Sequence, residues 1–161
     1  MKKFYLLLPI LALVFCGCRK DRLETENLRV PRLMVETRGV TYGNLGGQVV
    51  ELPVSGTRIA LQKEPLVSEF DIVNVELVKV DMGMALLVQT NETGARALYR
   101  GTVSNMGGRI VLTINNNPIG ARRVDGAIQN GNFYTFVEVE DEELGQLVLD
   151  IKETIKEVQD L

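Results

Sequence analysis

The chain has 161 residues and 45% hydrophobic residues, which fits one globular domain large enough to bury a core. Its 18 Lys and Arg against 21 Asp and Glu give a net charge of −3, and this balance argues against nucleic-acid binding, which needs a clustered basic surface. The sequence has no histidine and only two cysteines, which excludes Cys/His metal sites and catalytic pairs that use histidine. We therefore expect no enzymatic activity, metal ion or cofactor; an enzyme using only Asp, Glu, Lys or Tyr is the alternative class.

The first eighteen residues have the pattern of a bacterial lipoprotein signal. Two lysines precede an apolar run over residues 4–15, which has the length of a signal-peptide core and is too short to span a bilayer. Cys18 follows the small residue Gly17, as cleavage before a lipidated cysteine requires, whereas Cys16 follows a bulky phenylalanine. We predict that residues 1–17 are a signal peptide and that Cys18 carries lipid.

This signal predicts an exported protein that is anchored by lipid in the cell envelope and faces the periplasm. The residue after Cys18 is Arg19 rather than the Asp that retains lipoproteins in some inner membranes, which favours the outer membrane. Two alternatives stay open, an ordinary secretory signal cut elsewhere and an uncleaved anchor helix.

Residues 18–47 are predicted to form a tether and an irregular N-terminal extension, and residues 48–161 the folded domain. The stretch 19–30 is mostly charged, with too few apolar residues to offset the entropy of ordering. Residues 33–35 can form one short strand. The glycine-rich stretch 43–47 lacks the spacing of a dinucleotide fingerprint and is interpreted as a loop.

Two hairpins are expected in the first half of the domain. Residues 49–52 and 58–61 are β-rich and flank a turn that contains Ser and Gly. Residues 70–80 and 84–89 form a second antiparallel pair, with Gly83 supplying a positive φ at the turn.

A helix follows the second hairpin. Asn91 or Thr93 can cap its start, and Gly107 suits a left-handed position at its end. Its helical periodicity is carried by Ala95, Leu98, Thr102 and Met106.

Three strands are expected next. They cover residues 109–114, an extended stretch with a weak middle over 119–128, and residues 133–139. The turn at 115–118 contains three asparagines, which tolerate the left-handed region, and the pair Asn130-Gly131 is a hairpin signal.

The last helix is expected to begin in an acidic run, since negative charge is favourable at a helix N-terminus. This run, Glu138, Glu140, Asp141, Glu142 and Glu143, lacks the spacing of a calcium loop. One apolar stripe follows at helical spacing, made of Leu144, Val148, Ile151, Ile155 and Val158. We expect the stripe to pack on the core; a short coiled-coil seam is the alternative. The predicted fold is α+β, an antiparallel or mixed sheet with two helices packed on it.

The chain from about residue 58 to residue 149 resembles the head subdomain of the first periplasmic domain of SecD and SecDF, accessory proteins of the Sec translocase. The matching pieces are residues 61–67 with Asp71-Ile72, Gly94-Ala95-Arg96 at a helix start, Thr102-Val103-Ser104-Asn105-Met106-Gly107 at a helix end, residues 109–119, Ala127-Ile128-Gln129-Asn130-Gly131, and Glu142-Glu143-Leu144. The resemblance implies this fold and a tendency to contact exported or envelope proteins. It does not imply energy-coupled translocation, because the sequence carries neither the multiple transmembrane helices nor the proton pathway of those proteins. A periplasmic lipoprotein that binds a small ligand is the alternative function.

Four residues form the candidate interaction surface: Arg122, Arg123, Tyr134 and Phe136. The two arginines are the adjacent basic pair of the predicted domain, and in an extended segment they point to opposite faces, so solvated or salt-bridged arginines are the expected state. The two aromatic residues share one face of a predicted strand, and Phe133 lies on the other. One of these faces belongs to the core, and we expect a helix to cover the other, with an exposed binding patch as the alternative.

Overall fold

The computed structural model describes residues 28–37 and 47–160. Its first sheet consists of β1 (Pro31–Val35), β6 (Arg109–Ile114) and β7 (Asn117–Arg123), in the order β1-β6-β7. Both pairings are antiparallel, and the tight connection between β6 and β7 matches the predicted asparagine turn, because the backbone is left-handed there.

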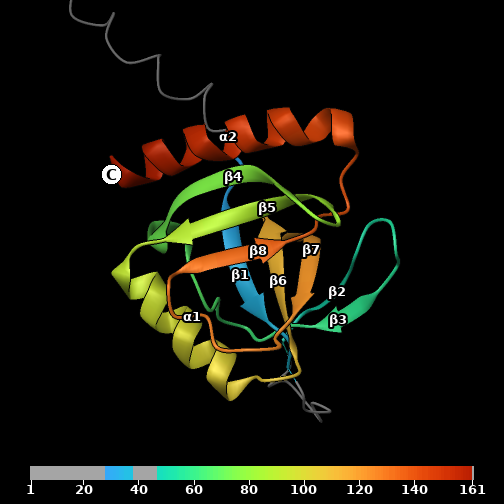
Figure 1. The fold of residues 1–161 in the computed structure, drawn as a ribbon, viewed down its shortest axis with the longest axis vertical. Coiled ribbons are helices and arrows are strands. Elements are labelled where there is room, and N and C mark those ends of the chain that lie inside the picture. Colours follow the sequence, from blue (N-terminus) through green and yellow to red (C-terminus); the bar gives the residue numbers. More distant parts are fainter. Residues whose placement is uncertain (1–27, 38–46, 161) are drawn as a thin grey trace, which may run out of the picture.

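The second sheet has the order β4-β5-β8 and is also antiparallel. It is built from β4 (Ile72–Val80), β5 (Gly83–Thr90) and β8 (Asn132–Thr135). The predicted hairpin of β4 and β5 is confirmed, since Gly83 has a φ of 129° at its turn. In Figure 1 this sheet lies in front of the first, α1 (Glu92–Ser104) lies below it, and α2 (Asp141–Gln159) lies along its upper edge.

One hydrophobic core joins the two sheets and both helices. It includes Leu33 and Leu112 from the first sheet, Phe133 from the second, Leu98 from α1 and Ile151 from α2, all fully or almost fully buried. The predicted apolar stripe of the last helix is confirmed as a core contact over its first four residues, and its last residue is partly exposed. Two helices packed on antiparallel sheets confirm the predicted α+β class.

A small second core lies on the opposite face of the first sheet. The predicted hairpin of β2 (Val49–Glu51) and β3 (Arg58–Ala60) is confirmed, and it packs on Val111 of β6. The buried side chains that the hairpin region contributes are Val50, Leu52, Ile59 and Leu61. The first sheet is therefore covered on both faces.

The strand β1 lies before residue 48, where the sequence analysis placed the start of the domain. Its side chain Leu33 is fully buried, so the fold includes residues 28–37 as well. The segment before it is held by α2, because the Arg29 amide donates to the hydroxyl of Thr154 at 2.8 Å and the Arg29 guanidinium lies 3.9 Å from Asp150. Residues 1–27, including the predicted signal peptide and Cys18, lie outside the described residues.

Two partly buried ion pairs at β1 and at the residue that follows it hold this strand in place. Arg32 binds Glu69 through two hydrogen bonds of 2.6 and 2.7 Å, and Arg109 of β6 binds Glu36 in the same two-pronged way. These hydrogen bonds lower the pKa of the Glu69 carboxyl and raise the pKa of both guanidinium groups. Such geometry fixes the orientation of a strand more firmly than a loose surface ion pair does.

The helix α1 begins as predicted, because the Asn91 side chain accepts a hydrogen bond of 2.9 Å from the amide of Gly94. It ends at Ser104, before Gly107, whose φ is 76°. Including Met106 in the helical periodicity was wrong, because the helix ends at Ser104 and Met106, which follows it, is 45% exposed.

The strands β7 and β8 are shorter than predicted. β7 ends at Arg123, although the amide of Val124 still donates to the carbonyl of Gly108 at 2.8 Å. β8 ends at Thr135, and the amide of Glu138 then bonds to the carbonyl of Ile119 in β7. In the described part of the chain, no helix is long and apolar enough to cross a membrane.

Candidate functional site

The two sheets meet at their edges. β7 pairs only with β6, and β8 pairs only with β5, among the described strands. The edges touch at one end, where the Glu138 amide donates to the carbonyl of Ile119 at 2.6 Å. Beside this contact, a Cβ added to Gly120 would lie 2.3 Å from the carbonyl oxygen of Phe136. The residue at position 120 must therefore lack a side chain for the edges to approach this closely.

Beyond this contact a cleft of about 510 Å³ lies between the two edges. Its lining includes all four residues of the predicted interaction surface, which the structure brings together. The lining consists of Val80, Ala85, Ala121, Arg122, Arg123, Tyr134, Thr135 and Phe136. Val80, Ala85, Ala121 and Thr135 were missed, because nothing in the sequence pairs β4 and β5 with β7.

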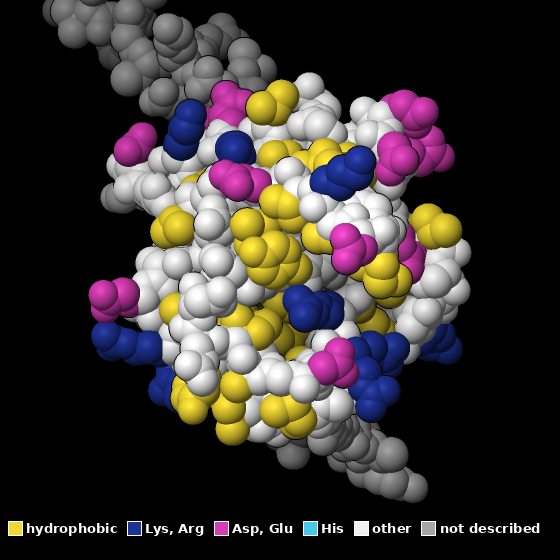
Figure 2. Space-filling view, viewed as in Figure 1, with side chains coloured by type: hydrophobic (Ala, Val, Ile, Leu, Met, Phe, Trp, Pro, Cys, Tyr) yellow, Lys and Arg dark blue, Asp and Glu magenta, His cyan; other side chains and the backbone are white. Residues whose placement is uncertain are grey.

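The aromatic face of β8 is exposed. Phe133 points into the core and is 1% exposed, whereas Tyr134 and Phe136 are 38% and 44% exposed. The prediction that a helix covers this face was wrong, because α1 and α2 bury their apolar sides in the core between the sheets. Tyr134 lies opposite Leu87 of β5, so apolar groups continue across the sheet. Figure 2 shows hydrophobic side chains gathered near the middle of this face, with Lys or Arg side chains beside them.

The two arginines have different partners. Arg122 lies opposite the core residue Ile110 in the ladder, and its guanidinium reaches β8 and donates to the carbonyl oxygen of Tyr134 at 3.1 Å. Arg123 lies on the opposite face of β7, and its guanidinium is 3.7 Å from the carboxylate of Asp125 in an exposed ion pair. As the alternation of a strand predicts, the two guanidinium groups do not act as one clamp.

A carboxylate next to the cleft holds the turn of the β2–β3 hairpin. One oxygen of Glu138 accepts hydrogen bonds of 2.8 Å from the amides of Val54 and Ser55. Burial raises the pKa of Glu138, but the hydrogen bonds from Ser55 and Val54 outweigh it and hold this pKa below its ordinary value. Glu138 was predicted to lie with the other acids at the start of the last helix, and its contact with the hairpin was missed. Asp141 does lie in the first turn of that helix, as predicted.

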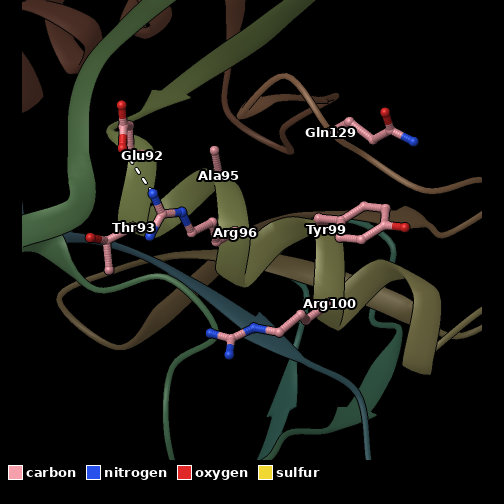
Figure 3. Close-up of a pocket in the computed structure, with 7 residues that line it drawn as sticks. All are labelled: Glu92, Thr93, Ala95, Arg96, Tyr99, Arg100 and Gln129. Atoms are coloured by element: carbon pink, nitrogen blue, oxygen red, sulfur yellow. Dashed lines mark hydrogen bonds and ion pairs between the residues drawn. The ribbon is translucent and has the colours of Figure 1, made fainter.

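A second, larger hollow of about 870 Å³ lies on the outer side of α1. Its lining comes from the helix and from Gln129 of the loop between β7 and β8. Figure 3 shows Tyr99 extending toward the side of Gln129, while Arg96, paired with Glu92, extends the other way along the helix. Small-ligand sites place several polar groups around one point, and these side chains diverge, so the hollow lacks that arrangement.

The described residues contain no group of three or more His, Cys, Asp or Glu side chains that could hold a metal ion. The partly buried charges of Arg32 and Glu69, and of Arg109 and Glu36, are paired with each other. The chemistry of the β7–β8 cleft is therefore that of an apolar surface bordered by guanidinium groups and strand edges.

No family model matches this sequence, and no curated protein matches it. Among solved structures, the chain is similar to one described as the structure and function of a membrane component SecDF that enhances protein export, with a TM-score of 0.57 and 15% identity over 78% of this chain and 62% of that one. A SecDF structure in a super-membrane-facing form gives a TM-score of 0.57 and 15% identity over 77% of this chain and 18% of that one. SecDF from Thermus thermophilus, described as a translocon-associated membrane protein, gives 0.50 and 17% over 84% and 21%.

These similarities show the fold. The chain has a SecDF-like α+β fold, which confirms the fold that the sequence resemblance implied. It spans 62% of the length of one of these chains and about a fifth of the other two.

Proposed function

We propose that this protein is a lipid-anchored component of the bacterial cell envelope whose domain binds other polypeptides and assists protein export or envelope assembly, without enzymatic activity. The observation that carries the proposal is the β7–β8 cleft, where Tyr134 and Phe136 lie exposed beside two strand edges. Exposed aromatic side chains and open strand edges are the features with which sheet proteins bind extended polypeptide.

The similar structures support the part of the proposal that concerns export. One of them is described as a membrane component that enhances protein export, and another as translocon-associated. A domain with the same fold on a lipid anchor would face the same compartment as exported chains. The polypeptides expected in the cleft are therefore exported or envelope proteins.

Site-specific photo-crosslinking tests the proposal. A photoreactive phenylalanine analogue placed at Tyr134 in the full-length protein, in membranes of the native host, should give adducts with other proteins. The matched control carries the same group at Leu149 of α2, which is 60% exposed and lies outside the cleft. Adducts at neither position, or equal adducts at both, would contradict binding through the cleft.

The anchor is tested by mass spectrometry of the mature N-terminus beside a Cys18→Ser variant. We expect acyl chains on Cys18, and loss of membrane attachment in the variant. An unmodified N-terminus in a fraction without membranes would contradict the anchor and leave the cleft proposal standing.

A further inference from the structure

The backbone groups of β7 that face the cleft can be identified from the ladder. The Arg109 carbonyl accepts a hydrogen bond from Glu36 next to β1, so Arg109 faces β1, and its neighbour Ile110 faces β7. Arg122, the ladder partner of Ile110, then faces β6. By alternation, the amides and carbonyls of Ala121 and Arg123 point away from β6 and into the cleft.

On the other side of the cleft, β8 presents the backbone of Tyr134. Its carbonyl receives the guanidinium of Arg122, so the backbone groups of this residue point away from β5. The neighbouring outward amide, that of Asn132, is occupied by the Asn130 side chain at 3.1 Å. The carbonyl of Tyr134 and the amide of Asn132 are the groups with which a further strand would pair, and in the free protein a side chain bonds to each of them.

The charge of the cleft is not balanced by an acid within it. Two arginines line it and no Asp or Glu does. Arg123 has Asp125 beside it, whereas the contact of Arg122 is a neutral carbonyl. A guanidinium binds a carboxylate more strongly than a carbonyl, because the charge-assisted bond is stronger and can be two-pronged.

We infer that the cleft selects extended polypeptide segments in which acidic and apolar residues alternate. Such a segment adds to the β8 edge as a further strand. Its carboxylate then binds the Arg122 guanidinium in place of the Tyr134 carbonyl. This inference rests on the proposed function. The bound segment bonds to the backbone of Tyr134, and its apolar side chains contact the rings of Tyr134 and Phe136. Arg122 thus protects the edge in the free protein and recognises the acid in the complex.

Three synthetic peptides of about ten residues test the inference against the mature full-length protein. One alternates Val and Glu, the second has Gln in place of Glu, and the third is the Glu peptide with N-methyl groups on every backbone amide, so that neither edge can donate a hydrogen bond. Fluorescence anisotropy should show the Glu peptide binding about tenfold more tightly than the Gln peptide, and the methylated peptide should not bind. The Arg122→Gln variant should bind the Glu and Gln peptides equally. The matched control is Arg96→Gln, at an exposed arginine of α1 outside the cleft, and it should keep the tenfold preference.

Equal binding of the Glu and Gln peptides to the unsubstituted protein would overturn the inference, as would binding of the methylated peptide or failure of both unmethylated peptides to bind. Crosslinks at Tyr134 under any of these results would show that the cleft binds polypeptide in another way, so the proposed function would stand. Absence of those crosslinks would count against the proposed function itself.

Discussion

The two edge strands of the β1–β6–β7 sheet, β1 and β7, differ in whether a further segment of the chain bonds along them. Along β1, residues 61–67 run beside the strand and bond to it: the amide of Gln62 donates to Val35 at 2.9 Å, and the amide of Leu66 donates to Leu33 at 2.8 Å. Along β7, the chain makes one close backbone contact after β8 and then leaves the edge facing a cleft. One edge of this sheet, β1, is closed by backbone. The other edge, β7, faces the cleft, and its Arg122 reaches across to bond with the carbonyl of Tyr134 on β8.

This difference indicates that the open edge is not a result of too short a chain. A segment of seven residues closes β1, and a loop of similar length, residues 124–131, passes from β7 to β8 without closing the other edge. Open strand edges invite pairing with other chains, and proteins usually cover them. The comparison predicts that substitutions of the buried side chains at the closed edge change stability, whereas substitutions of the exposed side chains that line the cleft change binding.

The largest effect is expected at the closed edge. Leu33→Ala removes a fully buried side chain from the main core and should lower the free energy of unfolding by about 2–5 kcal/mol. Chemical denaturation measures this loss, and Leu149→Ala, on an exposed position of α2, serves as the control with a change below about 0.5 kcal/mol. Equal midpoints for the two variants would contradict the assignment of β1 to the core.

The joint between the edges should be sensitive to added volume. Gly120→Ala places a Cβ 2.3 Å from the Phe136 carbonyl, which is backbone and cannot rotate away, so we expect a loss of about 1–3 kcal/mol. Gly126→Ala adds the same atom where nothing lies within 4 Å and should leave the melting temperature nearly unchanged. A tolerated Gly120→Ala would show that the edges separate without cost.

The contact of Glu138 with the hairpin turn should make a smaller, pH-dependent contribution. Glu138→Gln should cost about 0.5–1.5 kcal/mol at neutral pH, because a neutral amide accepts weaker hydrogen bonds from Val54 and Ser55 than a carboxylate does. The folded pKa lies below the ordinary value of about 4.3, so the contribution is full above that pH and is lost as the pH falls through the folded pKa. Denaturation curves at several pH values should therefore converge for the two proteins in acid; a constant difference would contradict the carboxylate's role.

The smallest effect on stability is expected on β8, across the cleft from the open edge. Tyr134→Ala removes a partly exposed ring and should change stability by less than about 1 kcal/mol. The same variant should lose most of the peptide binding described above, measured by anisotropy. A large loss of stability with unchanged binding would reverse the comparison between the two edges.

Features set by neighbouring residues could be predicted from the sequence. The stripe of α2, the Asn91 cap and the positive φ of Gly83 depend on spacing and residue type within a few positions. The inclusion of β1 in the fold could not be predicted in this way, because its pairing joins Val35 to Ile110, far along the chain. The free energy of that pairing comes from burying side chains of β1 against distant parts of the chain, and this burial cannot be predicted from a local pattern.

Half of the residues that line the candidate site were predicted from the sequence, but their arrangement was not. Arg122 and Tyr134 stood out as part of an adjacent basic pair and of an aromatic strand, yet their contact depends on how two sheets are placed. The helix expected over the aromatic face is absent because both helices have their apolar sides committed to the core. A pattern of apolar residues shows that a helix packs on a core and does not tell on which side of a sheet.

The attachment of β1 also has a mechanical consequence. A pull applied at residue 28 along the axis of β1 acts on the whole ladder with β6 and on the bonds to residues 61–67 together, in shear, rather than opening them one at a time. Arg29, held by Thr154, adds resistance before that ladder is loaded. Because forced unfolding is governed by the unfolding rate, a domain held through this end would resist tension longer than one held through β8, whose ladder with β5 spans only four residue pairs.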